Sequence, residues 1–293
     1  MYKYRLYGLN VESNMELNCY PAEFSEKDLT IKFTKNADEA RAWLDDICGG
    51  NPFREIAVND GHIYICNSEN IVVHAGKVSN LNLLTVYLLG AAVSNILLLK
   101  NVFTLHANTV LFEGCGLLLA GYSTAGKSTL STGFYKNGGK IVSDDVSRIE
   151  LDAAPPFIYP GIPSLKLWRE TAEELGVDLS GAILIQEDYD KYIVSKKDMF
   201  CDFPVPASAF INIVPDDGDE VELIKENITN ELNILIKNTY SRKRIPDAGK
   251  KEEYYRFLLR FCEKVPVYTL RRPADTLSVD RQISLIKEKI IHG

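Results

Sequence analysis

One eight-residue run has the clearest chemical potential in the sequence. It reads Gly121-Tyr122-Ser123-Thr124-Ala125-Gly126-Lys127-Ser128 and fits the phosphate-loop pattern G-x-x-x-x-G-K-[ST] without a gap. The glycines let backbone N–H groups point at phosphate oxygens, and the lysine and serine suit terminal phosphates and Mg²⁺. The pattern therefore predicts a site for ATP or another nucleoside triphosphate. Its predicted binding residues are Gly121, Ser123, Thr124, Ala125, Gly126, Lys127, Ser128 and Thr129.

Two adjacent aspartates follow the loop. Asp144 and Asp145 come 16 and 17 residues after Ser128 (144 − 128 and 145 − 128), at the end of a strand predicted at 140–143. In kinases with such a loop, a carboxylate at a neighbouring strand end serves Mg²⁺ directly or through water. The other carboxylate can accept a proton from an acceptor hydroxyl. One aspartate can thus serve Mg²⁺ together with Ser128 while the other takes the proton, and the residues alone leave both assignments of Asp144 and Asp145 open. The alternative is a pair that caps the strand or forms an ion pair with Arg148.

His106 is the third candidate. It lies in the run Thr104-Leu105-His106-Ala107-Asn108, before the loop. A lone histidine in an apolar run is usually a satisfied core residue, whereas strand ends near a phosphate loop often hold catalytic groups. The residues alone leave both interpretations open.

The elements that must position these residues have the pattern of an α/β domain. An apolar strand at 117–120 precedes the loop, and a predicted helix at 127–137 follows it and ends at Gly138-Gly139. A strand is predicted at 103–112, and two or three more between 191 and 214. Further helices are expected at 227–238, 250–263 and 275–291, with a strand at 265–270. Strands that alternate with helices favour an α/β domain.

Residues 1–80 have a different pattern. Alternating apolar residues predict strands at 29–33, 55–58, 61–65 and 70–73, with a helix at 37–47. No chemistry is evident in this part. We therefore divide the chain into a β-rich domain at 1–80, suited to substrate docking, and a nucleotide-binding domain at 81–293.

Composition limits the class of protein. The chain has 293 residues, 46% hydrophobic and 25% charged, which excludes disorder, collagen and coiled coil. Its net charge of −7 (33 − 40) argues against nucleic acid or an anionic membrane as partner. Polar residues and Gly90 interrupt the uncharged stretch 81–99, which favours a buried helix over a membrane span. Six scattered cysteines and the absence of a signal peptide predict a cytoplasmic protein, and the sequence is compatible with a homo-oligomer.

The run Leu105-His106-Ala107, the phosphate loop and Ser143-Asp144-Asp145 together resemble the catalytic domain of HPr kinase/phosphorylase. The similarity is closer to the HPr-kinase-like proteins found beside peptide-modification genes, including lasso-peptide precursor kinases. The spacings match those of HPr kinases: 21 residues from His106 to Lys127 and 17 from Ser128 to Asp145. The segment 159–168 and the ending Val265-Pro266-Val267 also resemble the smaller kinase-like group.

The resemblance implies a P-loop kinase domain of the HPr kinase and phosphoenolpyruvate-carboxykinase type. It also implies that Asp145 accepts the proton of a serine hydroxyl, that His106 lies near the transferring phosphate and that Ser128 binds Mg²⁺. Two departures stand out. HPr kinases have glycine where Thr124 stands, and their stretch with a metal-binding glutamate has no counterpart, which leaves Glu170 or Glu173 as candidates. The missing stretch argues against HPr as acceptor and against the phosphorylase reaction.

Phosphoryl transfer requires further cations near the γ-phosphate. The candidates are Lys166, then Lys191, then Arg242 and Arg244 in a basic run that could clamp phosphate or an acidic peptide. We expect an ATP- and Mg²⁺-dependent kinase that phosphorylates a serine-type hydroxyl on a peptide, small protein or metabolite. The alternatives are an accessory module that binds nucleotide and peptide without phosphoryl transfer, and a kinase of free serine or another metabolite.

Overall fold

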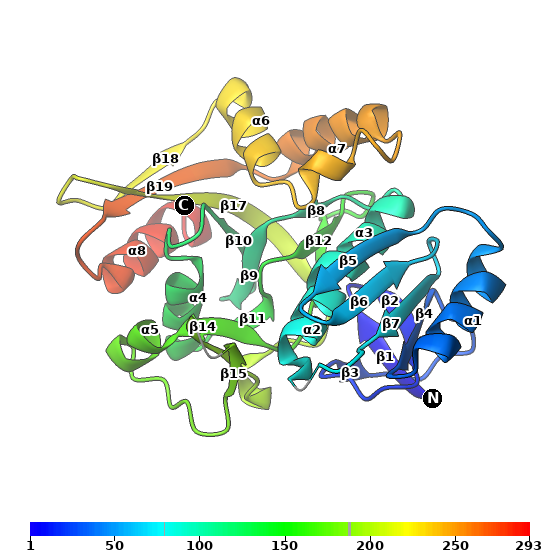
Figure 1. The fold of residues 1–293 in the computed structure, drawn as a ribbon. Helices are drawn as coiled ribbons and strands as arrows, with labels where there is room; N and C mark the ends of the chain where they lie inside the picture. The colour runs from blue at the N-terminus through cyan, green and yellow to red at the C-terminus, as the bar shows by residue number, and fades with distance from the viewer. Residues whose placement is uncertain (79, 187–188) are drawn as a thin grey trace. The chain divides into compact units, whose positions relative to one another are not determined.

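The protein is a mixed α/β structure with several sheets, described here from a computed structural model that covers residues 1–78, 80–186 and 189–293. It divides into two compact units (Figure 1). The first comprises residues 1–102 and 183–190, and the second comprises 103–182 and 191–293. The contacts place this division at 102/103, whereas the sequence suggests residue 80, and they assign the apolar stretch 81–99 to the first unit.

A seven-stranded sheet dominates the first unit. In pairing order its strands are β3 (Tyr20–Pro21), β1 (Tyr2–Leu6), β2 (Leu9–Ser13), β4 (Leu29–Thr34), β7 (Asn70–His74), β6 (Gly61–Ile65) and β5 (Arg54–Val58). Helix α1 (Ala37–Cys48) packs against β7 and β4. Asn36 begins it by accepting hydrogen bonds from the backbone N–H groups of Asp38 and Glu39, and Gly49 ends it at φ +54°. The helix predicted at 37–47 is confirmed.

The apolar stretch 81–99 is helical throughout. It consists of α2 (Leu81–Tyr87), a π-helical turn at Leu88–Ala92 and α3 (Val93–Leu99). Within the described residues, it is the one helix long and apolar enough to cross a membrane, and 56% of its most apolar window is buried in the protein. Ser94 and Asn95 are its buried polar residues, and the side-chain amide of Asn95 donates to Ala91 O at 2.6 Å. This burial is typical of a core helix. The short strand β15 (Ile183–Gln186) contacts α2 in the same unit.

The second unit is built on a nine-stranded sheet. Its central strands, in pairing order, are β11 (Lys140–Ser143), β9 (Ala107–Phe112), β10 (Cys115–Ala120), β17 (Val205–Asp216), β19 (Val267–Pro273) and β18 (Glu222–Lys225). Strand β10 is parallel to β17, and β17 is parallel to β19, whereas β9 is antiparallel to both β10 and β11. The remaining strands, β13 (Phe157–Tyr159), β12 (Ser147–Glu150) and β8 (Thr104–Leu105), continue the sheet from the start of β17.

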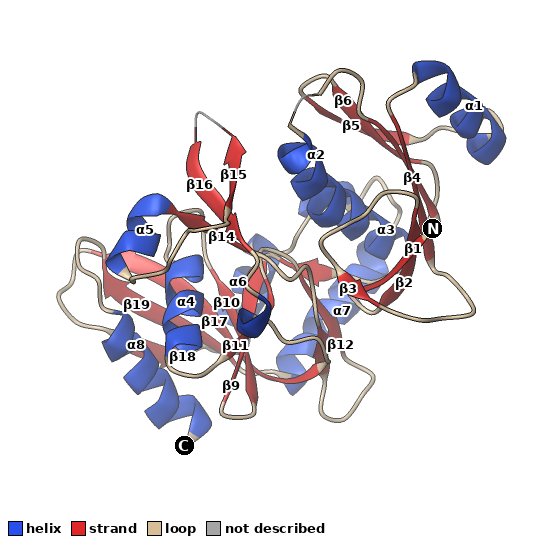
Figure 2. Cartoon of the chain, turned by 90° about the horizontal axis from the view of Figure 1, so that it is seen from below, coloured by secondary structure: helices blue, strands red, loops and turns tan. Residues whose placement is uncertain are grey.

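Helices cover both faces of this sheet (Figure 1). Helices α4 (Lys127–Lys136) and α8 (Val279–Ile286), the latter extended by a π-helical turn at Lys287–Ile291, lie side by side on one face (Figure 2). Alternate strand residues such as Leu117 and Leu119 point into the core that these helices cover. Helices α6 (Ile228–Lys237) and α7 (Lys251–Lys264) pack together on the other face, where Phe261 of α7 meets Phe210 of β17 edge to face.

A small substructure lies beside α4. Strand β14 (Leu165–Trp168) pairs with β16 (Tyr189–Val194) and contacts α4, and the short helix α5 (Arg169–Glu174) follows it. A 3₁₀ turn at Lys197–Met199 precedes β17.

Two predicted elements are wrong in detail. The strand predicted at 103–112 breaks at His106: β8 pairs with β12, while β9 pairs with β10. The final helix begins at Val279 rather than at residue 275, because 274–278 forms a loop after β19. Both differences matter for the candidate site.

Candidate active site

The predicted residues gather at one edge of the sheet in the second unit. Strand β10 runs into the 121–128 loop, and β11 points the same way because both strands flank β9 in antiparallel pairing. Asp144 and Asp145 therefore follow β11 at the edge where the loop follows β10. Strand β9 begins at this edge, since Ala107 lies opposite Ala120, so His106 and Asn108 are located there as well.

The 121–128 loop is compact and closed by its own lysine. Gly121 has φ +141°, and a Cβ at this position would lie 2.7 Å from Ile213 O, so only glycine fits. The loop runs into α4, and the Lys127 ammonium folds back to donate to Gly121 O at 2.8 Å and Tyr122 O at 3.3 Å. Burial is the main cause of a lowered pKa at Lys127, against the attraction of the two aspartates. The lysine thus folds back across the loop to the carbonyl groups of its first two residues.

Thr124 adopts an unusual backbone conformation in this loop. Its φ of +73° lies in the left-handed region, which a β-branched residue rarely enters. Arg272, at the end of β19, spans the same loop: Nε donates to Ala125 O at 2.9 Å and Nη2 to Thr124 O at 3.5 Å. Its Nη1 donates to Pro273 O at 2.7 Å. Arg272 therefore holds the strained part of the loop against the chain that leaves β19.

The two aspartates share one lysine. The Lys166 ammonium lies 2.8 Å from Asp144 Oδ2 and 2.9 Å from Asp145 Oδ2, and the Lys166 backbone N–H donates to Asp144 Oδ2 at 3.1 Å. Burial raises the pKa of Asp144, with Lys166 opposing it. Burial would also raise the pKa of Asp145, but Lys166 outweighs it and holds that pKa well below the usual range. Asp145 is therefore ionised at neutral pH, with 35% of its side chain exposed.

His106 faces Asp145 from the neighbouring strand. Its Nε2 lies 3.9 Å from Asp145 Oδ1, beyond direct hydrogen-bond distance. The backbone N–H of His106 donates to Asn238 O at 2.6 Å, and its ring stacks on Tyr240. Burial, together with nearby lysines, lowers the pKa of His106 despite the attraction of Asp145. The imidazole is therefore neutral at pH 7, able to donate one hydrogen bond and accept another.

The other predicted cations lie at different distances from this centre. Lys191 is close enough to lower the pKa of both Asp145 and His106, and its ammonium lies over the Trp168 ring. Arg242 and Arg244 form a 3₁₀ turn two to four residues after Tyr240, the residue stacked on His106. The structure therefore brings Lys166 and Lys191 to the aspartates.

The residues at this edge fit a magnesium ion. The carboxylate of Asp144 is 2% exposed, and its Oδ1 is buried without a hydrogen-bond partner among the described residues, so one hard oxygen donor is available. A carboxylate, the Ser128 hydroxyl, phosphate oxygens and water form the ligand set that Mg²⁺ prefers. Within the described residues no group of three acidic, histidine or cysteine side chains converges, so neither Glu170 nor Glu173 joins the aspartates there.

Sequence reasoning assigned no role to Asn108. This amide is fully buried in β9, and its Oδ1 accepts the backbone N–H of Asp145 at 3.0 Å while its Nδ2 donates to Ser131 in α4. It therefore fixes Asp145, which stands at φ +63°, relative to the loop helix. The sequence does contain a signal for Asn108. It lies two residues after His106 in an apolar strand, and alternate residues of a strand share one face.

No protein-family model and no curated protein sequence matches the chain. Among solved structures, the chain is similar to the HPr(Ser) kinase/phosphatase from Coxiella burnetii, at 15% sequence identity and a TM-score of 0.32. That alignment covers 63% of this chain and 94% of the other. A likeness at this level does not establish the family, so the case for a function rests on the geometry of the site.

Proposed function

We propose that the protein is an ATP- and Mg²⁺-dependent kinase that transfers the γ-phosphoryl group to a serine-type hydroxyl on a peptide, small protein or small molecule. One observation carries the proposal. A glycine-rich loop that opens a helix lies at the same sheet edge as an ionised aspartate, a buried aspartate and a shared lysine. These are the parts that phosphoryl transfer to a hydroxyl needs: an anion cradle, a metal ligand, a base and positive charge.

In this proposal the loop backbone and Lys127 hold the donor phosphates. The ammonium of Lys127 must exchange its present acceptors, Gly121 O and Tyr122 O, for β- and γ-phosphate oxygens. Both states satisfy the buried ammonium, so the exchange leaves no donor unpaired. Ser123, Thr124, Ala125, Gly126, Ser128 and Thr129 complete the proposed cradle.

Asp145 is the proposed base. The acceptor hydroxyl oxygen attacks the γ-phosphorus, the bond to the β,γ-bridging oxygen breaks, and the hydroxyl proton passes to an Asp145 carboxylate oxygen. A low pKa suits this role in a loose transition state, where the proton leaves late and the carboxylate mainly orients the hydroxyl. Neutral His106 orients the transferring group by a hydrogen bond, while Lys166 and Lys191 stabilise its negative charge.

Asp144 and Ser128 are the proposed metal-binding residues. Bound there, Mg²⁺ would neutralise phosphate charge that an acidic protein otherwise repels. The buried Oδ1 of Asp144 supports this assignment because it has no hydrogen-bond partner in the part of the chain that the structure describes.

The test combines one substitution with a search for the acceptor. Asp145→Asn should abolish transfer and leave nucleotide affinity nearly unchanged, since the amide keeps the size but cannot take the proton. We would incubate both proteins with γ-labelled ATP, Mg²⁺, free serine and peptides encoded by neighbouring genes, and then measure phosphorylated products by mass spectrometry. Labelled peptide supports the proposal, and labelled serine alone identifies a metabolite kinase. Tight nucleotide binding with no product from any acceptor contradicts transfer and identifies an accessory module.

A further inference from the structure

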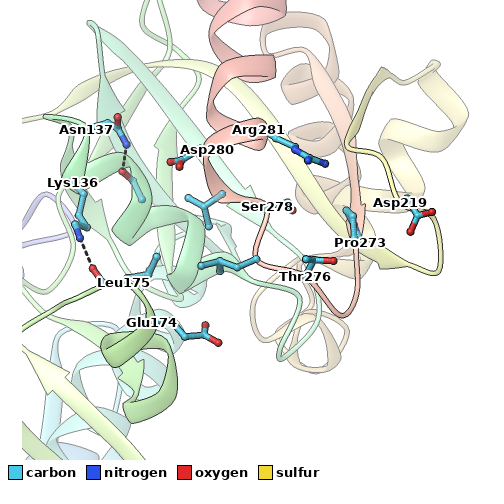
Figure 3. A pocket seen from close by; sticks show the side chains of 13 residues that line it. Lys136, Asn137, Glu174, Leu175, Asp219, Pro273, Thr276, Ser278, Asp280 and Arg281 are labelled. Atoms are coloured by element: carbon cyan, nitrogen blue, oxygen red, sulfur yellow. Dashed lines mark hydrogen bonds between the residues drawn. The ribbon is translucent and has the colours of Figure 1, made fainter.

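Two adjoining cavities lie along helix α4 in the second unit. The first, of about 240 Å³, is lined by residues of the loop end and the start of α4, among them Gly126 and Thr129, together with Glu170 and Arg272. The second, of about 600 Å³, continues toward the end of α4 (Figure 3). Five residues line both cavities: Glu174, Thr276, Leu277, Ser278 and Val279. We call the two cavities together the α4 groove.

The sheet order places this groove on the donor side of the loop. Along the sheet edge, β11 with Asp144 and Asp145 comes first, then β9, then β10 with the loop, then β17 and β19. The acceptor must approach the γ-phosphate from the aspartate side, because Asp145 takes its proton. The leaving nucleotide lies in line on the far side of the γ-phosphorus. That far side is the β19 side, where Arg272 and the loop 274–278 line the groove.

The groove is also long enough to hold a nucleoside. Its first cavity begins at Gly126 and Thr129, so it is continuous with the proposed phosphate cradle. From Thr129 to Gly133, which lines the second cavity, the helix rises about 6 Å, at about 1.5 Å per residue. A ribose and a base that extend from an α-phosphate at Thr129 therefore run along α4 into the second cavity.

The lining offers both apolar and polar contacts. Leu277 is 51% exposed, although it is aliphatic, and it belongs to the wall that both cavities share. Glu170 and Glu174 are exposed at the same groove and form no ion pair with any residue of the described chain. A flat base can cover the leucine, and a carboxylate can accept hydrogen bonds from ribose hydroxyls.

We propose that the α4 groove is the nucleoside subsite of the phosphate donor, with the ribose beside Glu170 and the base against Leu277. The inference rests on the proposed function, since it requires the 121–128 loop to hold the phosphates. It assigns Leu277 and Glu170 to donor recognition, which gives the exposed leucine a role.

The test separates nucleoside contacts from phosphate contacts. The affinities of MgATP and of magnesium tripolyphosphate, which has no nucleoside, are measured by calorimetry for the parent, Leu277→Ala and Glu170→Gln. The matched control is Leu259→Ala, because Leu259 is equally exposed at 51% but lies on α7. Lys127→Met is the phosphate-side control.

Each groove variant should weaken MgATP about fivefold relative to tripolyphosphate, as expected when a partial apolar or polar contact is lost. Leu259→Ala should leave both affinities unchanged, and Lys127→Met should weaken both ligands together. The proposal is overturned if neither groove variant changes the ratio of the two affinities, or if Leu259→Ala changes it equally. The proposed kinase function fails differently: the parent then binds both ligands and still forms no phosphorylated product, or it binds neither.

Discussion

Lys166 is the residue on which the charge balance of the site depends. Its ammonium contacts both aspartates, one of which is almost fully buried, so the three side chains form a compact charged cluster. The two carboxylates outweigh burial and raise the pKa of Lys166. Removal of one member of such a cluster leaves the remaining charges without compensation.

We predict that Lys166→Met lowers the free energy of unfolding by about 3 kcal/mol, because Asp144 is left as a buried charge without its ammonium. Mg²⁺ should then stabilise the variant more than the parent, since it replaces the missing cation. Urea unfolding with and without Mg²⁺ measures both effects. Lys196→Met is the control, because Lys196 pairs with Asp178 at the surface, so its loss should change the free energy of unfolding much less. Equal losses in the two variants would contradict the shared role of Lys166.

Thr124 and Arg272 should behave as a coupled pair. Arg272→Gln removes the hydrogen bonds that hold the loop at the strained Thr124, so MgATP should bind more weakly. Thr124→Gly removes strain of about 1–2 kcal/mol and should restore much of the affinity in the Arg272→Gln background. A double-mutant cycle on the dissociation constant measures the coupling. Additive effects would show that Arg272 acts in some other way.

His106 should make stability depend on pH. Burial lowers its pKa in the folded protein, so between that value and the unfolded value of about 6.5 the unfolded chain binds a proton that the folded chain does not. Stability should therefore fall as pH drops from 7.5 to 5.5. His106→Asn should reduce this fall, measured by urea unfolding at both pH values, while the other three histidines are common to both proteins. If the parent and His106→Asn had the same pH dependence of stability, a group other than His106 would cause it. Asp145, Lys127, Lys166 and Lys191 all lie near enough to affect the pKa of His106.

At the residue scale, the sequence predicts those features of the site that depend on a local pattern. The loop pattern lies within eight residues, so the sequence alone defines its members. The sequence marks Lys166 as a candidate cation, but no local pattern predicts its pairing with both aspartates. The contact of Arg272 with the loop joins residues that are 147 apart in the chain. It depends on the order of the strands in the sheet, which neither local segment predicts.

At the scale of elements, α4 and α8 pack closely against each other. A Cβ built on Gly133 would lie 2.2 Å from Val279 Cγ1, so the missing side chain is what lets the two helices approach. Helix α4, which follows the 121–128 loop, is thereby held against α8.

Gly133→Ala should therefore destabilise the protein by about 1–3 kcal/mol through overpacking. In an open helix position the same change would stabilise by up to about 1 kcal/mol. Val279→Ala in the same chain should recover part of the loss, because it removes the clashing methyl group. Urea unfolding of the two single variants and the double variant measures the effect. A Gly133→Ala protein more stable than the parent would disprove the close packing.

Prediction of elements succeeded where periodicity and stop signals were local. The helices at 227–238 and 250–263 are confirmed as α6 and α7, within one residue at each end. The break at His106 could not be predicted, because it depends on pairing with β12 and on a hydrogen bond to Asn238, 132 residues away. An apolar run has the same sequence pattern whether it forms one strand or two strands that pair with different neighbours.

At the scale of the whole molecule, the proposed function requires an acidic protein to bind an anionic donor. The net charge of −7 repels phosphates, so affinity must come from Lys127, Lys166 and Lys191 and from the loop N–H groups. The division into two units was only partly visible in the sequence. Residues 183–190 belong to the first unit although their neighbours on both sides belong to the second, and only long-range contacts define this.

The most direct measurement of the central claim needs no knowledge of the acceptor, because water can take its place. The protein is incubated with MgATP in ¹⁸O-labelled water, and ADP and phosphate are measured by mass spectrometry. We predict slow ADP formation, with one ¹⁸O atom in each phosphate, and loss of this turnover in Asp145→Asn while its affinity for MgATP persists. ADP formation that Asp145→Asn leaves unchanged, or a parent that binds MgATP without any cleavage, would contradict phosphoryl transfer at this site.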